Sequence, residues 1–503
     1  MKKRLSVLSL FLVAVILFAQ LMVSCSGSEQ NNVSVEDNDN LQLSDDAVED
    51  TDVSDQIEAY EFPDVDYGGT DFIILNINPI WDFITEIIVE EQTGEALNDA
   101  MYTRNTMVGE QFGVNLKEIK VDLGQIDRRI STAILAGDDT YDIMYCPTSS
   151  GSSFAVGSLA LDGLFYNLLD IPELKLDKTW WDKTMLEEGV VGSDKALYFA
   201  ASDIHFFWMQ APICMFFNED MMQTLGLDLP YSAVRKGEWT LDEFNKYTKA
   251  GARLNGDESF AFNADGNSIY GYATWQEGIT SMIIGTGEKY VTTDNNGMPY
   301  LAIENERFYN VCQKIADMLT VPGEFQQSNN AANHHEGLFK AGRALFMTAE
   351  LKGADVLRTM DTTFGIAPMP KYDTKQESYH TMVARESLVM VIPVTNSDPH
   401  KAGIIMDAMA YLSHKDVTPV FYDITVSQKR LRNEESVEML KIIRDSKYFN
   451  IGLAYGWING SEMYGQLSAS VFSGNGNIVS IIEKYRDIIN GRIADSISIM
   501  SSK

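Results

Sequence analysis

Aromatic and polar side chains recur near the ends of the strands that the sequence predicts, and these side chains are the best equipped to do chemistry. Rings offer flat apolar surfaces for stacking, whereas carboxylates, hydroxyls and guanidinium groups exchange hydrogen bonds. Together they suit a flat solute that is rich in hydroxyl groups. The candidate ligand-binding residues are Trp81, Asp82, Ser149, Trp208, Tyr272, Trp275, Glu350, Arg385, Glu386, Tyr455 and Trp457.

Each candidate also has a purely structural explanation. A tryptophan in a chain of this length belongs to the core more often than to a ligand site. Arg385 and Glu386 are adjacent and could form an ion pair at a hinge, and Ser149 could cap a helix. Trp275 is the strongest single candidate, because it ends the aromatic run Tyr270-Gly271-Tyr272-Ala273-Thr274 just before a predicted helix.

Catalytic and metal-binding motifs are not evident in the sequence. With 72 acidic residues, carboxylates are too numerous to identify a catalytic pair. The six histidines show no ligand spacing, and no nucleophile elbow or phosphate-binding loop occurs. We therefore predict no catalytic residue, no metal and no cofactor. A secreted enzyme that acts on glycans remains an alternative.

The N-terminus predicts export. Three basic residues precede an apolar run from Leu5 to Val23, so residues 1–24 are interpreted as a signal peptide rather than as a membrane-spanning helix. Val23-Ser24-Cys25 resembles a bacterial lipoprotein processing site. That resemblance implies lipidation of Cys25 and anchoring at the outer face of the cell membrane. Residues 25–66 are acidic and contain no Lys or Arg, which predicts a disordered tether.

Charge and cysteine content exclude further classes. The net charge is −33, so the chain lacks the basic surface that nucleic-acid binding needs. A neutral or cationic ligand is favoured over an anionic one. After Cys25 only Cys146, Cys214 and Cys312 remain, each in an apolar stretch that predicts a small buried side chain. The sequence leaves open whether two of these three cysteines form a disulfide.

Residues 72–146 predict alternating strands and helices. Phe72 to Leu75 is a continuous apolar run typical of a buried strand, and residues 97–112 form one helical face that ends at Gly113. A strand at 114–118, a helix at 126–134 and a strand at 141–146 follow. This order favours a parallel α/β sheet whose ligands bind beyond the carboxyl ends of the strands.

The stretch from Phe216 to Phe244 predicts a strand, a helix that stops at Gly226, a proline turn and a second helix. Thr240 and Glu243 have the spacing of a capping box, in which each side chain pairs with the other residue's backbone N–H. Three segments then resemble the extracellular solute-binding proteins of family 1, which serve ABC importers and bind mostly sugars. They are residues 217–240, with Glu219 where the family has Lys and Trp239-Thr240 in reversed order, residues 339–344 and residues 365–370.

This resemblance implies a two-lobe periplasmic-binding-protein-like fold of class II. Each lobe would be a mostly parallel sheet flanked by helices, joined by a hinge of about three crossings near 213–217, 343–348 and 387–393. The first lobe would comprise residues 67–212 and 349–386, and the second residues 213–348 and 387–503. The implied partners are a carbohydrate and the permease subunits of an ABC transporter; a peptide or another small solute is the alternative ligand.

Overall fold

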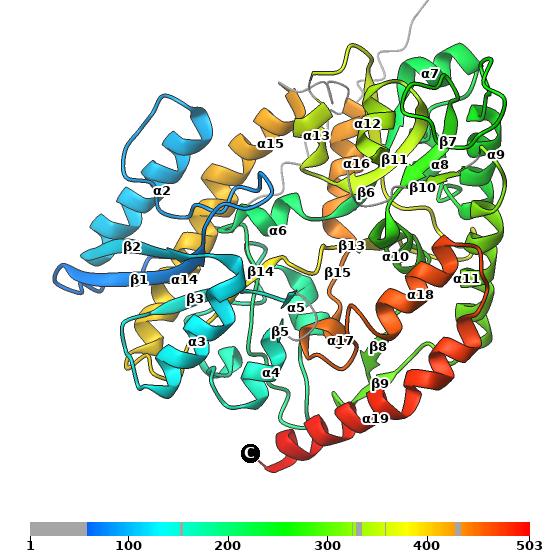
Figure 1. Cartoon of the computed structure of the whole chain (residues 1–503). Helices are drawn as coiled ribbons and strands as arrows, with labels where there is room; N and C mark the ends of the chain where they lie inside the picture. The colour runs from blue at the N-terminus through cyan, green and yellow to red at the C-terminus, as the bar shows by residue number, and fades with distance from the viewer. Residues whose placement is uncertain are drawn as a thin grey trace, which may run out of the picture. The chain divides into compact units, whose positions relative to one another are not determined.

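The structure, a computed structural model, describes residues 58–150, 154–323, 325–327, 334–357, 359–427 and 434–502. The predicted signal peptide, Cys25 and most of the predicted tether lie outside the described residues. The described chain builds two main sheets, each flanked by helices (Figure 1). No helix within these ranges combines the length and the apolar character needed to span a bilayer.

The first sheet has four strands. Three of them run parallel, and the fourth, an edge strand at Leu388–Val391, runs antiparallel to them. In spatial order they are Leu388–Val391 (β14), Ile143–Pro147 (β3), Thr70–Ile77 (β1) and Val114–Val121 (β2). The helices of this lobe are Ala96–Phe112 (α2), Ile126–Leu135 (α3), Val156–Leu161 (α4), Lys183–Glu188 (α5), Phe206–Gln210 (α6), Pro399–Leu412 (α14) and Thr418–Ser427 (α15). The predicted strand–helix alternation of residues 72–146 is confirmed. Gly113 ends α2 in the left-handed conformation that glycine adopts without strain.

The second sheet has five strands, four of which run in one direction. In spatial order they are Phe325–Gln327 (β10), Tyr270–Thr274 (β7), Ala344–Glu350 (β11), Ile213–Asn218 (β6) and Phe364–Ala367 (β12). Strand β6 is antiparallel to both of its neighbours. The helices of this lobe are Glu219–Leu225 (α7), Tyr231–Arg235 (α8), Leu241–Gly251 (α9), Gln276–Gly285 (α10), Glu306–Leu319 (α11), His334–Lys340 (α12), Gly353–Leu357 (α13) and Glu434–Asp445 (α16).

Short elements and the C-terminal helices complete the described chain. Three two-stranded sheets pair Ser149–Ser150 (β4) with Phe154–Ala155 (β5), Val291–Thr293 (β8) with Pro299–Leu301 (β9), and Thr381–Met382 (β13) with Lys447–Tyr448 (β15). The C-terminal helices are Ile451–Ala454 (α17), Met463–Phe472 (α18) and Ile478–Ser502 (α19). Helix α18 packs against α10, α11 and α19.

The stretch from β6 to α9 is built as predicted, with one difference at its second helix. Helix α7 ends at Gly226 in the left-handed region (φ 66°), and Thr240 caps α9 by accepting from the Glu243 N–H at 3.3 Å. The carboxylate of Glu243 pairs with Lys246 instead of turning back to the cap. Only the Thr240 half of the predicted capping box is therefore observed.

The assignment of the later segments to lobes needs correction. Strand β11 does not cross between lobes, because it pairs with β7 and β6 inside the second sheet. Strand β12, within the 349–386 segment expected in the first lobe, also pairs with β6. Strand β14, within the 387–503 segment expected in the second lobe, pairs with β3 of the first sheet. Apolar runs identify buried strands, but they do not reveal which sheet completes its hydrogen bonds.

Three crossings nevertheless join the lobes. The chain enters the second lobe at residues 211–213, returns between β12 and β14, and crosses again between α15 and α16. Helix α15 contacts α2, whereas α16 contacts β12, and Arg235 on α8 forms ion pairs with Glu435 and Glu438 on α16. The predicted number of crossings is thus observed, but the second begins after residue 367 and the third after residue 427, both later along the chain than expected.

The end of the predicted tether is packed rather than solvated. The Tyr60 ring stacks on Tyr411, with centroids 4.7 Å apart and planes 21° apart, and Phe62 packs against Phe112. The prediction rested on the average polarity of residues 25–66. That average gave no weight to these two aromatic side chains, which pack their rings against the first lobe. The prediction of a tether extending to residue 66 is therefore wrong for its last residues.

The three remaining cysteines are buried, as their apolar surroundings predicted. Cys146 lies in β3, Cys214 in β6 and Cys312 in α11, and none is bonded to another. Burial raises the pKa of each thiol above its usual range. These side chains therefore act as small apolar groups of the core.

Candidate functional site

The candidate site lies where strand ends of the two sheets approach the second crossing. Strand β3 ends at Pro147, and the next two residues contact the returning chain: the Thr148 hydroxyl and the Ser149 N–H (2.9 Å) both donate to the Arg385 carbonyl oxygen. Strand β11 ends at Glu350 on the other side. Because ligands of such sheets bind beyond the carboxyl ends of the strands, this junction is the natural binding place.

The first and second crossings run side by side here. The Ala384 N–H donates to the Ala211 carbonyl oxygen at 3.1 Å, and the Leu351 N–H donates to the Pro212 carbonyl oxygen at 2.8 Å. Glu350 pairs with Ile213 across the sheet. Glu350 and the segment that carries Arg385 are thus both held against the first crossing, residues 211–213.

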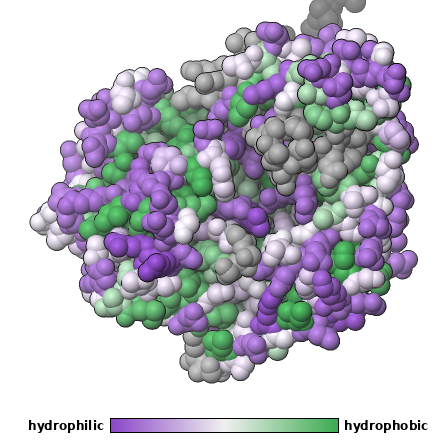
Figure 2. Space-filling view, viewed as in Figure 1, coloured by the Kyte–Doolittle hydropathy of each residue, from purple (hydrophilic) through white to green (hydrophobic). Residues whose placement is uncertain are grey.

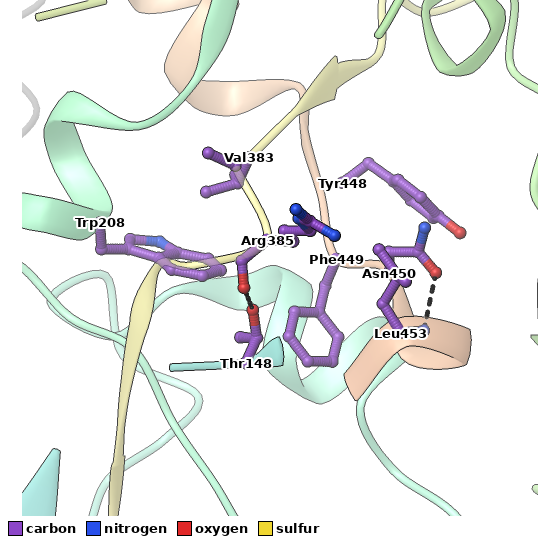
Figure 3. A pocket seen from close by; sticks show the side chains of 9 residues that line it. Thr148, Trp208, Val383, Arg385, Tyr448, Phe449, Asn450 and Leu453 are labelled. Carbon is purple, nitrogen blue, oxygen red and sulfur yellow. Dashed lines mark hydrogen bonds between the residues drawn. The ribbon is translucent and has the colours of Figure 1, made fainter. Parts of the chain in front are cut away.

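A small pocket opens around Arg385, with room for about one water molecule. Figure 3 shows the Arg385 side chain between the Trp208 ring on one side and Tyr448 and Asn450 on the other. The walls come from the first lobe, the second crossing and the C-terminal region. The lining residues are Thr148, Trp208, Val383, Ala384, Arg385, Tyr448, Phe449, Asn450 and Leu453.

Charged groups gather beside this pocket in an arrangement that we call the Glu277 cluster: Glu277, Glu350, Arg385 and Glu386. Arg385 Nε lies 2.9 Å from Glu386 Oε1, which confirms the predicted ion pair at the hinge. Burial raises the pKa of Glu277 to about 8; the charges of Glu386 and Glu350 raise it and that of Arg385 lowers it. Burial also raises the pKa values of Glu350 and Glu386. Glu277 therefore holds a proton near neutral pH.

The start of α10 brings Glu277 to this place. Gly278 packs so tightly that an added Cβ would lie 2.1 Å from the Thr274 hydroxyl oxygen and 3.3 Å from Thr348. A larger residue would push α10 away from the ends of β7 and β11. Glycine here lets the Glu277 carboxylate approach the end of β11.

Trp275 stands at the entrance to α10, as its predicted position at a strand end required. Its half-buried ring stacks on His335, with centroids 4.9 Å apart and planes 24° apart. One face of the indole is thus engaged within the second lobe. Only the opposite face is left for a ligand.

Four other predicted aromatic residues are buried, with at most 2% of their surface exposed. Tyr272 hydrogen-bonds Thr348 inside the second sheet, and the Trp208 indole N–H donates to Asp182 at 2.6 Å while its ring borders the pocket. Tyr455 and Trp457 stack on each other at 4.8 Å, and the Trp457 N–H donates to Ser496 on α19. In this structure Tyr272, Tyr455 and Trp457 are packing residues.

Trp81 and Asp82 form an exposed left-handed turn at φ 51° and 59°. Trp81 is 53% exposed, and its carbonyl oxygen accepts from Lys352 of the second lobe. The Lys352 ammonium also lies 4.2 Å from the centroid of the Phe83 ring. This turn therefore connects the lobes through Lys352, whose charge also acts on Glu350 of the Glu277 cluster.

Ser149 lies in β4 rather than at the start of a helix, so the capping alternative for it is wrong. A second, roomier pocket opens beside it, toward the C-terminal region. Its lining residues are Ser149, Phe154, Ala155, Ser158, Leu453, Gly456, Ile458, Asn459, Gly460 and Arg492. Polar residues prevail over much of the face that Figure 2 shows, in line with the acidic composition.

Sequence reasoning missed several residues at the site: Glu277, Tyr448, Phe449, Asn450 and Tyr464. Glu277 could have been found, because it follows Trp275 by two positions in the first turn of a predicted helix. The others lie far along the chain, and no motif marks them. In the part of the chain that the structure describes, no three His, Cys, Asp or Glu side chains converge as metal ligands.

Comparisons with known proteins yield likenesses of structure only. No protein-family model matches the sequence, and no curated protein matches it. A cyclo/maltodextrin-binding protein complexed with maltotetraose has a similar structure with a TM-score of 0.53 and 13% identity, covering 88% of this chain and 98% of that one. The galacto-N-biose-/lacto-N-biose I-binding protein of the ABC transporter from Bifidobacterium longum gives a TM-score of 0.54 at 12% identity, covering 87% and 99%.

A third similar structure is an ABC substrate-binding protein from Listeria monocytogenes in complex with cycloalternan. Its TM-score is 0.53 at 11% identity, and the match covers 85% of this chain and 99% of that one. At such identities the likenesses establish the fold. The predicted two-lobe periplasmic-binding-protein-like fold, with a mostly parallel sheet flanked by helices in each lobe, is confirmed.

Proposed function

We propose that this protein is the solute-binding component of an ABC importer, which captures a sugar or oligosaccharide between its two lobes and delivers it to the permease. The observation that carries the proposal is the meeting of strand ends from both sheets at the Glu277 cluster, directly beside two hinge crossings. A ligand that contacts both lobes there favours their closed arrangement, because its contacts are complete only in that state.

The chemistry of the site supports a carbohydrate. Glu277, Glu350 and Glu386 can accept hydrogen bonds from hydroxyl groups, and Arg385 can donate them. The half-buried Trp275 ring supplies an apolar surface of the kind that stacks on the C–H face of a sugar. A peptide or another small solute would use the same groups differently, so ligand class is a question for experiment.

Binding without turnover is the simpler role for these carboxylates. A glycosidase needs one carboxylic acid and one carboxylate on opposite sides of the scissile bond. Here Glu386 is engaged by Arg385 at 2.9 Å, and the cluster lies against the hinge itself. Release of chromophore from nitrophenyl glycosides would contradict the binding role and favour the enzyme.

Export and anchoring complete the proposal. Residues 1–24 would direct secretion, and a lipid on Cys25 would hold the protein at the outer face of the membrane, within reach of a permease. Cys25→Ser should release the mature protein into the soluble fraction. Retention of this variant in the membrane fraction would refute the lipid anchor.

A thermal-shift screen of the mature protein against mono- and oligosaccharides tests the function. A ligand at 100 times its Kd adds about 2.7 kcal/mol of stability, so a true ligand raises Tm visibly. Arg385→Gln should lose the shift, whereas the control Arg235→Gln, which changes a surface ion pair on α8, should keep it. A peptide library that raises Tm where no sugar does would refute the carbohydrate.

A further inference from the structure

The Glu277 cluster has more negative than positive groups. Three carboxylates face one guanidinium, and Arg385 is already paired with Glu386 at 2.9 Å. The described residues give neither Glu277 nor Glu350 an ion pair of its own. A proton held by Glu277 near neutral pH offsets part of this excess, and a cation supplied by a ligand can take the place of that proton.

The nearest lysine does not fill that role. Lys352 is close enough to lower the pKa of Glu350. Its ammonium, however, donates to the Trp81 carbonyl oxygen and lies over the Phe83 ring of the first lobe. It is therefore committed to the contact between the lobes.

Glu277 provides a second, independent observation. Its Oε1 atom is fully buried and has no hydrogen-bond partner among the described residues. Leaving a buried carboxylate oxygen unpartnered costs stability, and folded proteins rarely retain such a group without a use for it. Glu277 lies in the first turn after β7, and β7 pairs with β11, so this unmet acceptor belongs to the end of the second sheet from which Glu350 also comes.

We propose that the ligand carries a free amino group, as an amino sugar does, and that its ammonium is held by Glu277 and Glu350 while Arg385 and Glu386 hydrogen-bond the neighbouring hydroxyls. This inference rests on the proposed function and names the ligand class for that same site. The ammonium takes the place of the Glu277 proton and satisfies Glu277 Oε1. An acetylated amine is neutral and does neither.

Proton release is the signature of this arrangement. The charged groups that act on Glu277 are Glu386, Arg385 and Glu350. The charge of Glu277 in turn raises the pKa of Tyr464 on α18. Without ligand, burial and the charges of Glu386 and Glu350 keep Glu277 protonated at pH 6, against the opposing charge of Arg385. An arriving ammonium stabilises the carboxylate, so the proton leaves as the ligand binds. Affinity for a charged amine should therefore rise from pH 5 to pH 7.

The experiment is calorimetric titration of the mature protein with four probes: a glucosamine trisaccharide, its N-acetylated counterpart, maltotriose and spermidine. Heats measured at pH 6 in two buffers of different ionisation enthalpy give the number of protons exchanged. We expect the glucosamine trisaccharide to bind about tenfold tighter than its N-acetylated counterpart and to release about one proton. The N-acetylated form should release none.

A matched pair of variants assigns the effect to Glu277. Glu277→Gln should abolish the proton release and remove the preference for the amine over the acetamide. Glu306→Gln changes an exposed glutamate in the first turn of α11 and should alter neither. Retained proton release in Glu277→Gln would overturn the assignment, even if that variant binds less tightly.

The outcomes separate this inference from the proposed function. Equal affinity for both trisaccharides, or maltotriose as the best probe, overturns the amino-sugar inference and leaves the carbohydrate function standing. Binding of spermidine but of no saccharide overturns the carbohydrate function and leaves a cationic site. Failure of both amine probes to bind overturns the inference directly.

Discussion

Two buried charged clusters in this protein have opposite character. In the first, which we call the Asp182 cluster, the Asp182 carboxylate accepts from Thr184, from the Trp208 indole at 2.6 Å and from Lys447. Burial pushes the pKa of Asp182 upward, but the charge and hydrogen bond of Lys447 outweigh this and leave the pKa lowered. In the Glu277 cluster burial prevails, and the pKa of Glu277 is raised.

The difference distinguishes a structural joint from a place that awaits a ligand. The Asp182 cluster ties the first lobe to the C-terminal region with its charge balanced and its acceptors filled. Such a pair gives up much stability if one partner is removed. The Glu277 cluster has a protonated buried carboxyl group and an unfilled acceptor at a hinge, which a ligand would fill.

The largest effect should come from breaking the Asp182 cluster. Lys447→Met leaves the nearly inaccessible Asp182 carboxylate, 4% exposed, without its cation. We expect a loss of about 3–5 kcal/mol in the free energy of unfolding, measured by urea titration. Lys441→Met, at an exposed pair on α16, should cost less than about 1 kcal/mol. Equal losses would show that the Asp182 pair is not a structural joint.

A smaller loss should follow Trp208→Phe, which keeps a smaller aromatic ring at this position but removes the 2.6 Å hydrogen bond to Asp182. A hydrogen bond to a charged group contributes about 1.5–3 kcal/mol, so urea titration should show a loss near the lower end of that range. In a Lys447→Met background the two losses should not add, because both act on one carboxylate. Additive losses in the free energy of unfolding would show that Trp208 does not act through Asp182.

Removing the charge of Glu277 should change the free energy of unfolding in the opposite direction. The pKa of Glu277 in the folded protein is about 8, above its ordinary value of 4.5, so the folded state holds a proton that the unfolded state releases. Stability from this group is present below the unfolded pKa, falls as the pH rises between the two values, and is lost above pH 8.

Glu277→Gln should therefore stabilise the unliganded protein at pH 8.5, by on the order of 1–2 kcal/mol, and change little at pH 5. Urea titration at the two pH values measures the difference, with Glu306→Gln as the control. A destabilised Glu277→Gln variant at pH 8.5 would mean that the carboxylate is satisfied in the unliganded protein, and the contrast between the clusters would disappear.

The smallest expected effect concerns Trp275. Trp275→Ala should weaken sugar binding by about tenfold, through loss of a stacking surface. Trp457→Phe, which lacks the hydrogen bond to Ser496, should change stability but not affinity. Calorimetric titration with the same sugar measures both variants. Unchanged affinity in Trp275→Ala would exclude stacking at this ring.

Local structure was predictable from the sequence, whereas long-range pairing was not. Gly113 and Gly226 ended their helices where expected, because a left-handed residue favours glycine. The segment of β11 was expected to cross between the lobes and that of β12 to lie in the first lobe, whereas both strands belong to the second sheet. Their hydrogen-bond partners in β6 lie more than 120 residues away along the chain, and no local pattern records that distance.

The candidate site was predictable in part. Glu350, Arg385 and Glu386 were among the predicted ligand-binding residues, and the structure brings all three close to Glu277. Trp275, also predicted, precedes Glu277 by two residues. Trp457 could not be judged, because a tryptophan in a Gly-rich loop can face a ligand or, as here, pack under a helix. Burial of an aromatic ring depends on segments distant in sequence.

Hydrogen–deuterium exchange with and without sugar tests the central claim most directly. The probe is whichever of maltotriose and the glucosamine trisaccharide raises Tm, and each peptide is compared with the unliganded protein. The account predicts new protection in residues 274–278, 350–352 and 383–387, and unchanged exchange at 181–184. Protection confined to other segments, with the Glu277 cluster unaffected, would contradict it.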